Sequence, residues 1–267
     1  MQISRANLIN REIKGKQMNS IKKTTTTRDQ DYIGKIKDII DERPSYGYRR
    51  VTAILNRDHQ GNNINHKKVY RLMRENDLLL HRYGKRPRRT HDGKVTTLNS
   101  NMRWCSDCFG IRCDNGDTVY VAFSMDCCDR ETMRHIASSK GINGEMIRDL
   151  MIESVEYRFG NIDKLPHKIQ WLSDNGPCYT SYDTVNFGRG LGFEICTTPP
   201  YSPESNGMAE SFVKTFKRDY VWFGDLSDAK TVMEQLDGWF ADYNNFAPHK
   251  GLKMLAPREF MRHNQKK

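Results

Sequence analysis

The sequence of 267 residues has no uninterrupted run of about eighteen apolar residues, the length a helix needs to cross a membrane. Its first residues, Met1 to Arg5, show neither an apolar signal core nor a small-residue cleavage site. A G-x4-G-K-[ST] loop, which would cradle nucleotide phosphates, is missing as well. We therefore expect a cytoplasmic chain that has no membrane segment and no phosphate-binding loop of this kind.

Cysteine spacing supplies only half of a zinc site. Cys105 and Cys108 form a Cys-x-x-Cys pair, but no second such pair and no His-x3–5-His pair follows at a usable distance. The seven cysteines are also an odd number in a chain without a signal peptide, which favours reduced thiols over disulfides. We therefore interpret these cysteines as reduced thiols buried in strands, in preference to ligands of a structural zinc ion.

Positive charge is concentrated in the first part of the chain. The net charge is +10. Residues 1–98 hold 23 lysines and arginines against 10 acidic residues, whereas residues 99–267 hold 20 against 23. This asymmetry predicts a polyanion-binding module joined to a second unit of a different kind, although a merely soluble basic surface is an alternative.

Apolar residues at helical spacing predict three short helices after a polar segment, residues 1–28, that we expect to be flexible. The first runs from about Asp29 to Asp41 and the second from about Tyr48 to Asn56. The third begins near Asn65, a good N-cap residue, and runs to about Glu75. Three helices joined by tight turns indicate a helix-turn-helix DNA-binding domain over residues 29–80.

The third helix carries polar and basic side chains off its apolar face, where they would meet phosphates and base edges. A basic linker with many turn-forming residues follows over residues 81–99. A solvated basic face is the alternative interpretation, but the charge asymmetry favours DNA. The expected DNA contacts are His66, Lys67, Tyr70, Arg71, Arg74, Arg86, Arg88 and Arg89.

After residue 100 the pattern changes to strands. Arg103–Cys113 and Thr118–Cys127 read as a β-hairpin, in which Asn115-Gly116 supplies the positive φ angles of a two-residue turn. A third strand near 133–138, and then helices and strands in alternation, predict a mixed α/β sheet with helices on its faces. We assign residues 100–225 to this core and residues 226–267 to a helical C-terminal extension.

Three carboxylates stand out by position. Asp107 lies on the same strand face as Cys105, Phe109 and Ile111, and a charge among apolar neighbours needs a cation or a hydrogen-bond partner. Asp174 ends a strand, where ligand sites form in α/β sheets. Glu210 lies one turn into a helix. Taken singly, each has a structural explanation, such as pairing with arginine, capping a turn or complementing a helix dipole.

The residues around these carboxylates resemble the D,D-35-E signature of retroviral integrases and integrase-like insertion-sequence transposases. The matching segments are residues 104–107 (WCSD), 173–176 (SDNG) and 202–210 (SPESNGMAE), and 35 residues separate Asp174 from Glu210. Lys217, which shares a helix face with Glu210 and Lys214, stands at the family's basic position. Asn206 would cap this helix.

The resemblance covers about residues 30–262 and is strongest to the second-frame, OrfB-type product of such elements. Asp126 and Arg130 resemble the family's D-x-x-S-R element, although Asp129 replaces the serine. Tyr243-Asn244 and the segment 248–260 resemble the C-terminal part of these transposases. We interpret Asp126, a rival third carboxylate, as structural.

The resemblance implies a ribonuclease H-like core that cleaves and joins DNA strands at the ends of a mobile element. Asp107, Asp174 and Glu210 would be both the catalytic residues and the ligands of two Mg²⁺ ions, with Mn²⁺ as a substitute. Lys214 and Lys217 would bind DNA. It also implies a homo-oligomer on DNA and an upstream OrfA-type partner or fusion. The alternatives are a non-catalytic DNA-binding regulator and a ribonuclease H-like nuclease.

Overall fold

The computed structural model describes residues 27–57, 63–80, 97–198 and 207–264. The chain divides into two units. The first comprises residues 1–92 and 248–256, and the second comprises residues 93–247 and 257–267. Within the described residues, no helix is long and apolar enough to cross a membrane.

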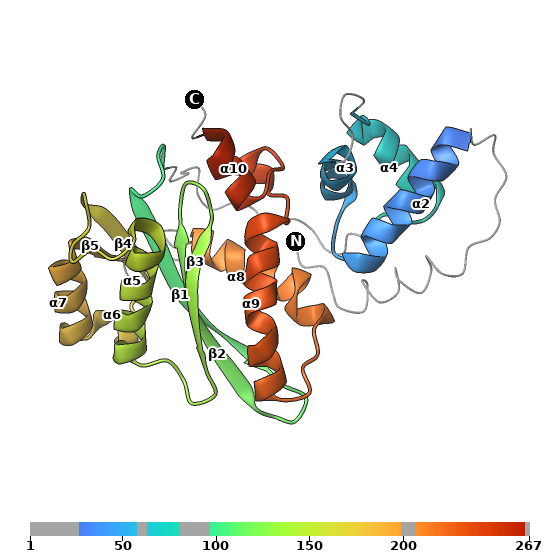
Figure 1. Ribbon diagram of the computed structural model, residues 1–267. Coiled ribbons are helices and arrows are strands. Elements are labelled where there is room, and N and C mark those ends of the chain that lie inside the picture. The colour runs from blue at the N-terminus through green and yellow to red at the C-terminus, as the bar shows by residue number, and fades with distance from the viewer. Residues whose placement is uncertain (1–26, 58–62, 81–96, 199–206, 265–267) are drawn as a thin grey trace. The chain divides into compact units, whose positions relative to one another are not determined.

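The first unit is built on three helices, α2 (Thr27–Glu42), α3 (Tyr48–Arg57) and α4 (His66–Glu75), drawn in blue to teal in Figure 1. They enclose an apolar core in which Ile36, Val51 and Val69 are fully buried. Asn65 is the N-cap of α4, since its Oδ1 accepts a hydrogen bond from the backbone N–H of Lys67 at 2.9 Å. The predicted three-helix domain is confirmed.

The second unit contains a five-stranded sheet in the order β3-β2-β1-β4-β5. Both β1–β2 and β2–β3 are antiparallel, and β1–β4 and β4–β5 are parallel. The predicted mixed sheet with flanking helices is therefore confirmed. Its strands are β1 (Arg103–Arg112), β2 (Thr118–Asp126), β3 (Thr132–Ser138), β4 (Ile169–Ser173) and β5 (Phe193–Thr197).

Helices cover both faces of this sheet (Figure 1). On one face α5 (Gly144–Phe159), α6 (Pro177–Thr180) and α7 (Tyr182–Leu191) pack around Trp104 and Trp171. On the other face α8 (Gly207–Asp219) and α9 (Ala229–Asn245) pack against Cys105, Phe109 and Phe123. The alternation predicted for β1 is thus observed, because its odd-numbered residues enter the core beneath α8.

The turn between β1 and β2 differs from the expected two-residue hairpin. The strands are paired only as far as Arg112 and Thr118, and the N–H of Cys113 donates to the carbonyl of Asp117 at 2.8 Å. Of the residues in this loop, Gly116 alone has a positive φ, +96°. A turn that needs two positive φ angles was therefore the wrong prediction, and Gly116 alone supplies the left-handed residue of a longer loop.

Candidate functional site

Asp107 of β1 and Asp174, the residue that follows β4, lie at the same level of the sheet. Parallel strands β1 and β4 are in register at Arg103 with Gln170 and at Cys105 with Leu172. Continuing this register by two residues places Asp107 opposite Asp174, which directly follows β4. The sheet topology thus brings together two carboxylates that are far apart in the sequence.

Glu210 comes from the helix that covers the same face of β1. Ala209, Phe212 and Phe216 of α8 are buried in the core that also contains Phe109. This packing leaves Glu210 half-exposed, and its Oε2 is 3.2 Å from the Nζ of Lys214. In this arrangement Lys214 neutralises Glu210 within α8.

The electrostatics of Asp107 report on the other two carboxylates. Burial first, and then the negative charges of Asp174 and Glu210, raise its pKa to about 6. A hydrogen bond from the backbone N–H of Cys108 at 2.8 Å and the charge of Lys217 act in the opposite direction. The three carboxylates therefore share one electrostatic environment, in which their negative charges repel one another and a bound cation would reduce this repulsion.

Lys217 is the second basic residue of α8 near this environment. Its Nζ lies 5.5 Å from the centroid of the Phe109 ring. Burial lowers the pKa of Lys217, and the charge of Asp107 raises it. Lys217 therefore leans over β1 beside Asp107, whereas Lys214 points along its own helix towards Glu210.

The donor set suits a hard divalent cation, because Mg²⁺ prefers carboxylate oxygen ligands. Within the residues that the structure describes, no group of three histidine, cysteine or acidic side chains is yet close enough to hold an ion. Glu210 is paired with Lys214, and Asp174 Oδ1 accepts from the N–H of Gly176 at 2.9 Å. For Glu210 to join a metal site, its ion pair with Lys214 would have to break.

Asp126 has a different setting. It is fully buried at the end of β2, where it pairs in register with Trp104. Its carboxylate accepts from the N–H groups of Asn101 at 2.6 Å, Cys128 at 2.7 Å and Asp129 at 3.2 Å. Burial, and then the charge of Asp129, raise its pKa to about 6. With its oxygens already occupied by backbone donors, Asp126 holds the turn after β2.

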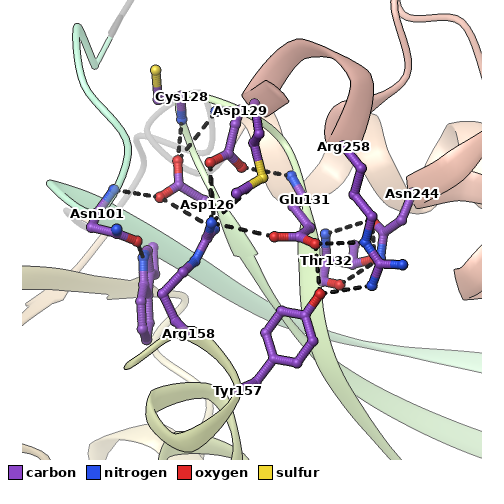
Figure 2. A network of polar contacts seen from close by, with 12 residues as sticks. Asn101, Asp126, Cys128, Asp129, Glu131, Thr132, Tyr157, Arg158, Asn244 and Arg258 are labelled. Carbon is purple, nitrogen blue, oxygen red and sulfur yellow. Dashed lines mark hydrogen bonds and ion pairs between the residues drawn. The ribbon is translucent and has the colours of Figure 1, made fainter. Parts of the chain in front are cut away.

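A buried ionic network extends from this turn (Figure 2). The guanidinium of Arg158 on α5 lies 3.8 Å from Asp126, 3.4 Å from Asp129 and 3.3 Å from Glu131. Arg258 on α10 (Pro257–Asn264) donates to Glu131 from the other side at 2.8 Å. A cavity of about 440 Å³ beside the network contains none of the three candidate carboxylates among its lining residues. The network is thus a structural assembly that connects β2, α5 and α10.

The predicted DNA contacts on α4 fall into two groups. Lys67 and Arg74 are exposed, and His66 and Tyr70 flank the ring of Tyr48 at centroid distances of 6.3 and 5.1 Å. Arg71 instead pairs with Asp29 of α2 at 3.0 Å, beside Lys68 at 2.6 Å. Arg71 therefore also fastens α4 to α2.

Four of the expected positions lie outside the described residues, namely Arg86, Arg88 and Arg89 of the basic linker and the proposed helix cap Asn206. The cysteine pair considered for zinc is divided between the two faces of β1, with Cys105 in one core and Cys108 against the other. All seven cysteines are free thiols.

Sequence reasoning missed Tyr179 on α6. Its hydroxyl lies 2.8 Å from Ser106 Oγ and 3.3 Å from Cys108 Sγ, and these two residues flank Asp107. Gly176-Pro177 is a usable signal for a helix start, since proline is favoured at the first helical position. Nothing in that signal says which strand the helix would touch.

The chain matches models of known protein families and the fold of a solved structure. Residues 27–86 match an HTH-like domain, and residues 98–203 and 191–257 match models of the integrase core domain. A chain in the cryo-electron microscopy structure of the simian T-cell lymphotropic virus intasome in complex with PP2A regulatory subunit B56 gamma is similar in fold. Its TM-score is 0.50 at 15% identity, over 80% of this chain and 70% of that one. These matches define an integrase core of the ribonuclease H-like type.

Curated relatives are much closer in sequence. The transposase InsD for insertion element IS2A/D/F/H/I/K of Escherichia coli is 46% identical over 88% of this chain and 80% of its own length. The 48.2 kDa protein of insertion element IS2A from Escherichia coli is also 46% identical, and the chain spans 57% of its length. The chain therefore belongs to the integrase-like transposases of insertion elements, which are polynucleotidyl transferases of DNA transposition.

Proposed function

We propose that Asp107, Asp174 and Glu210 are the catalytic carboxylates of this transposase and hold two Mg²⁺ ions, or Mn²⁺ in their place. The observation that carries the proposal is the β1–β4 register, which continues to Asp107 and Asp174 on the face of β1 that α8, the helix of Glu210, covers; the charges of Asp174 and Glu210 also raise the pKa of Asp107. Three carboxylates from different elements can hold two ions roughly 3.5–4 Å apart. Bound there, such ions would activate the attacking oxygen and stabilise the leaving oxygen at phosphorus.

The remaining steps fall to residues of the chain. Asp107, which interacts electrostatically with both Asp174 and Glu210, would hold the ions together with these two carboxylates. Lys214, released from Glu210, and Lys217 would bind the phosphates of the element end. Cleavage followed by strand transfer exchanges one phosphodiester bond for another, so no nucleotide is consumed.

The expected partners follow from the same proposal. DNA would be bound by the exposed face of α4, with Lys67 and Arg74 on phosphates. Joining two element ends requires at least two subunits, so we propose a homo-oligomer assembled on DNA. We also propose an upstream OrfA-type partner or fusion, consistent with the chain covering 57% of the longer IS2A relative.

The test compares Glu210→Gln with a matched variant, Glu234→Gln. Glu234 also lies on a helix and pairs with a lysine one turn away, Lys230, at 3.8 Å. The assay is nicking of supercoiled plasmid in Mg²⁺ or Mn²⁺, followed by joining of a labelled end. We expect metal-dependent nicking in wild type and Glu234→Gln, and a loss of about a thousandfold in Glu210→Gln, the scale of a lost transition-state contact.

Three results would count against the proposal. Equal nicking by Glu210→Gln and wild type would show that the carboxylates are misassigned. Nicking without any joining, in the chain fused to its upstream partner, would favour a nuclease. DNA binding with neither reaction in the fused protein would favour a regulator of transposition.

A further inference from the structure

Tyr179 contacts the strand that carries Asp107 and lies five residues after Asp174 in the chain. It belongs to α6, the short helix that begins three residues after Asp174. Its side chain is 3% exposed, and its hydroxyl bonds to Ser106 Oγ at 2.8 Å and Cys108 Sγ at 3.3 Å. Burial holds the pKa of Tyr179 well above its usual value, so the phenol remains protonated.

Ser106 and Cys108 are the two neighbours of Asp107 in β1. Because side chains alternate along a strand, theirs point away from the face of Asp107 and towards α6. The register pairs of β1 with β4 end at Cys105 and Leu172, before the level of Asp107 is reached. Beyond that point, the hydroxyl of Tyr179 connects β1 to the segment that follows β4, through contacts on the face of β1 opposite Asp107.

The other end of this tie is Asp174. Its Oδ1 accepts from the N–H of Gly176 at 2.9 Å, and the carbonyl of Gly176 accepts from the N–H groups of Tyr179 and Thr180 at 3.0 and 3.1 Å. A Cβ atom at Gly176 would lie only 3.0 Å from Asp174 Oδ1. Asp174 and Tyr179 therefore belong to one compact hydrogen-bonded turn.

We infer that Tyr179 is a positioning residue that fixes the distance between the carboxylates of Asp107 and Asp174, and so sets the affinity of the site for its divalent cations. This inference rests on the proposed function of the two aspartates. The connection runs from Asp107 through its neighbours Ser106 and Cys108 to the phenol, and from there through Gly176 to Asp174. Residues that orient metal ligands in this way typically change affinity by about 10- to 100-fold when they are altered.

The alternative is that Tyr179 only fills the core beneath α5, with its hydroxyl satisfied incidentally. The two roles differ in what a loss of the hydroxyl changes. If Tyr179 only packs in the core, loss of its hydroxyl lowers stability and leaves the metal affinity unchanged. If the hydroxyl is a positioning contact, its loss weakens metal binding in the folded protein. Metal affinity must therefore be measured by itself, apart from activity.

The experiment measures Mn²⁺ binding to the full chain from the electron paramagnetic resonance signal of free Mn²⁺, with plasmid nicking as a second readout. Tyr179→Phe keeps the ring and removes the hydroxyl. We expect Mn²⁺ affinity to fall on the order of 10-fold, and the Mn²⁺ concentration for half-maximal nicking to rise in parallel. Ser106→Ala removes one of the two partners of this hydroxyl, and we expect the double variant of Ser106→Ala with Tyr179→Phe to lose little more affinity than Tyr179→Phe alone.

Tyr157→Phe is the matched control. Its hydroxyl also bonds to two side chains of the same unit, Glu131 at 2.7 Å and Arg258 at 2.7 Å, but neither adjoins Asp107. We expect this variant to melt at a lower temperature and to bind Mn²⁺ like wild type. An equal loss of affinity in both variants would identify a general effect of lost stability and overturn the inference.

Asp107→Asn separates this inference from the proposed function. If Asp107→Asn abolishes Mn²⁺ binding while Tyr179→Phe and Ser106→Ala bind like wild type, the positioning role is wrong and the metal site stands. If Asp107→Asn binds Mn²⁺ like wild type, the proposed metal site itself is wrong. Should Tyr179→Phe fail to fold, the smaller change Ser106→Ala gives the decisive affinity.

Discussion

Asn244, near the end of α9, fastens that helix to the first residue of β3 through Thr132 (Figure 2). Its Oδ1 accepts from the backbone N–H and from the hydroxyl of Thr132, both at 3.0 Å, and its Nδ2 donates to the carbonyl of Thr132 at 2.8 Å. Asn244 is 4% exposed. A single amide thus satisfies a buried N–H, a buried hydroxyl and a buried carbonyl at an edge of the sheet.

Asn244→Ala should destabilise the second unit by about 2 to 5 kcal/mol, because it leaves two buried backbone groups of Thr132 without a partner. Urea unfolding followed by tryptophan fluorescence measures this unit specifically, since all four tryptophans lie within it. Asn186→Ala, on the exposed face of α7, is the control and should stay within about 0.5 kcal/mol of wild type. Equal midpoints for the two variants would contradict the assignment.

Arg258 should be required for α10 to remain attached to the core. Its guanidinium bonds to Glu131 at 2.8 Å, to the hydroxyl of Tyr157 at 2.7 Å and to Asn245 at 3.1 Å. We expect Arg258→Met to cost about 2 to 3 kcal/mol, because Glu131 would keep its buried charge with one cation fewer. Arg262→Met removes the same charge from an exposed position of α10 and should have little effect. The check is the same fluorescence transition.

Local patterns were enough to predict the elements that carry the candidate carboxylates. Strand signals predicted β1 over Arg103–Cys113, where the structure has Arg103–Arg112, and alternation placed Asp107 on the face of β1 that carries Cys105 and Phe109, which α8 covers. The turn at Gly116 was mispredicted because Asn-Gly fits several loop lengths, and only the strand register decides among them.

The contacts of Asn244, Arg258 and Tyr179 could not be predicted from a single sequence. The bonds of Asn244 to Thr132, of Arg258 to Glu131 and of Tyr179 to Ser106 each join residues more than seventy positions apart, and they depend on how the strands and helices are assembled. The resemblance of residues 243–260 to the C-terminal part of related transposases showed that this segment matters. The structure supplies the physical reason for Asn244 and Arg258, which is the anchoring of α9 and α10 to the second unit.

Lys67, on the exposed face of α4, should contribute a phosphate contact when the chain binds DNA. Lys67 is exposed, and Arg71 pairs with Asp29 at 3.0 Å. Losing one phosphate contact lowers the slope of log affinity against log salt concentration by about 0.9. We therefore expect Lys67→Ala to weaken binding to duplex DNA of any sequence. The slope of log affinity against log salt concentration should become less steep by about one.

Lys35→Ala is the control for this experiment, because it removes the same charge from an exposed position on α2. Its salt dependence should match that of wild type. Fluorescence anisotropy with a labelled duplex at several salt concentrations gives the slopes. Identical slopes for wild type, Lys67→Ala and Lys35→Ala would show that α4 does not contact the DNA backbone at Lys67.

The raised pKa of Asp107 predicts how metal-induced stabilisation depends on pH. Burial and its acidic neighbours raise this pKa to about 6 from an ordinary value of 3.8. The folded chain therefore holds this proton more tightly than the unfolded chain does. Without metal, its contribution to stability is fully present below about pH 4 and is lost as the pH rises to about 6.

A bound cation must displace the same proton, so metal affinity should change in the opposite direction. The rise in Tm that Mn²⁺ causes should be small at about pH 5, grow through about pH 6 and level off by about pH 7. In Asp107→Asn the Mn²⁺-dependent shift should be absent, which separates Asp107 from other groups that titrate in this range, such as Asp126. A shift in wild type that is the same at about pH 5 and pH 7 would mean that Asp107 is not a metal ligand.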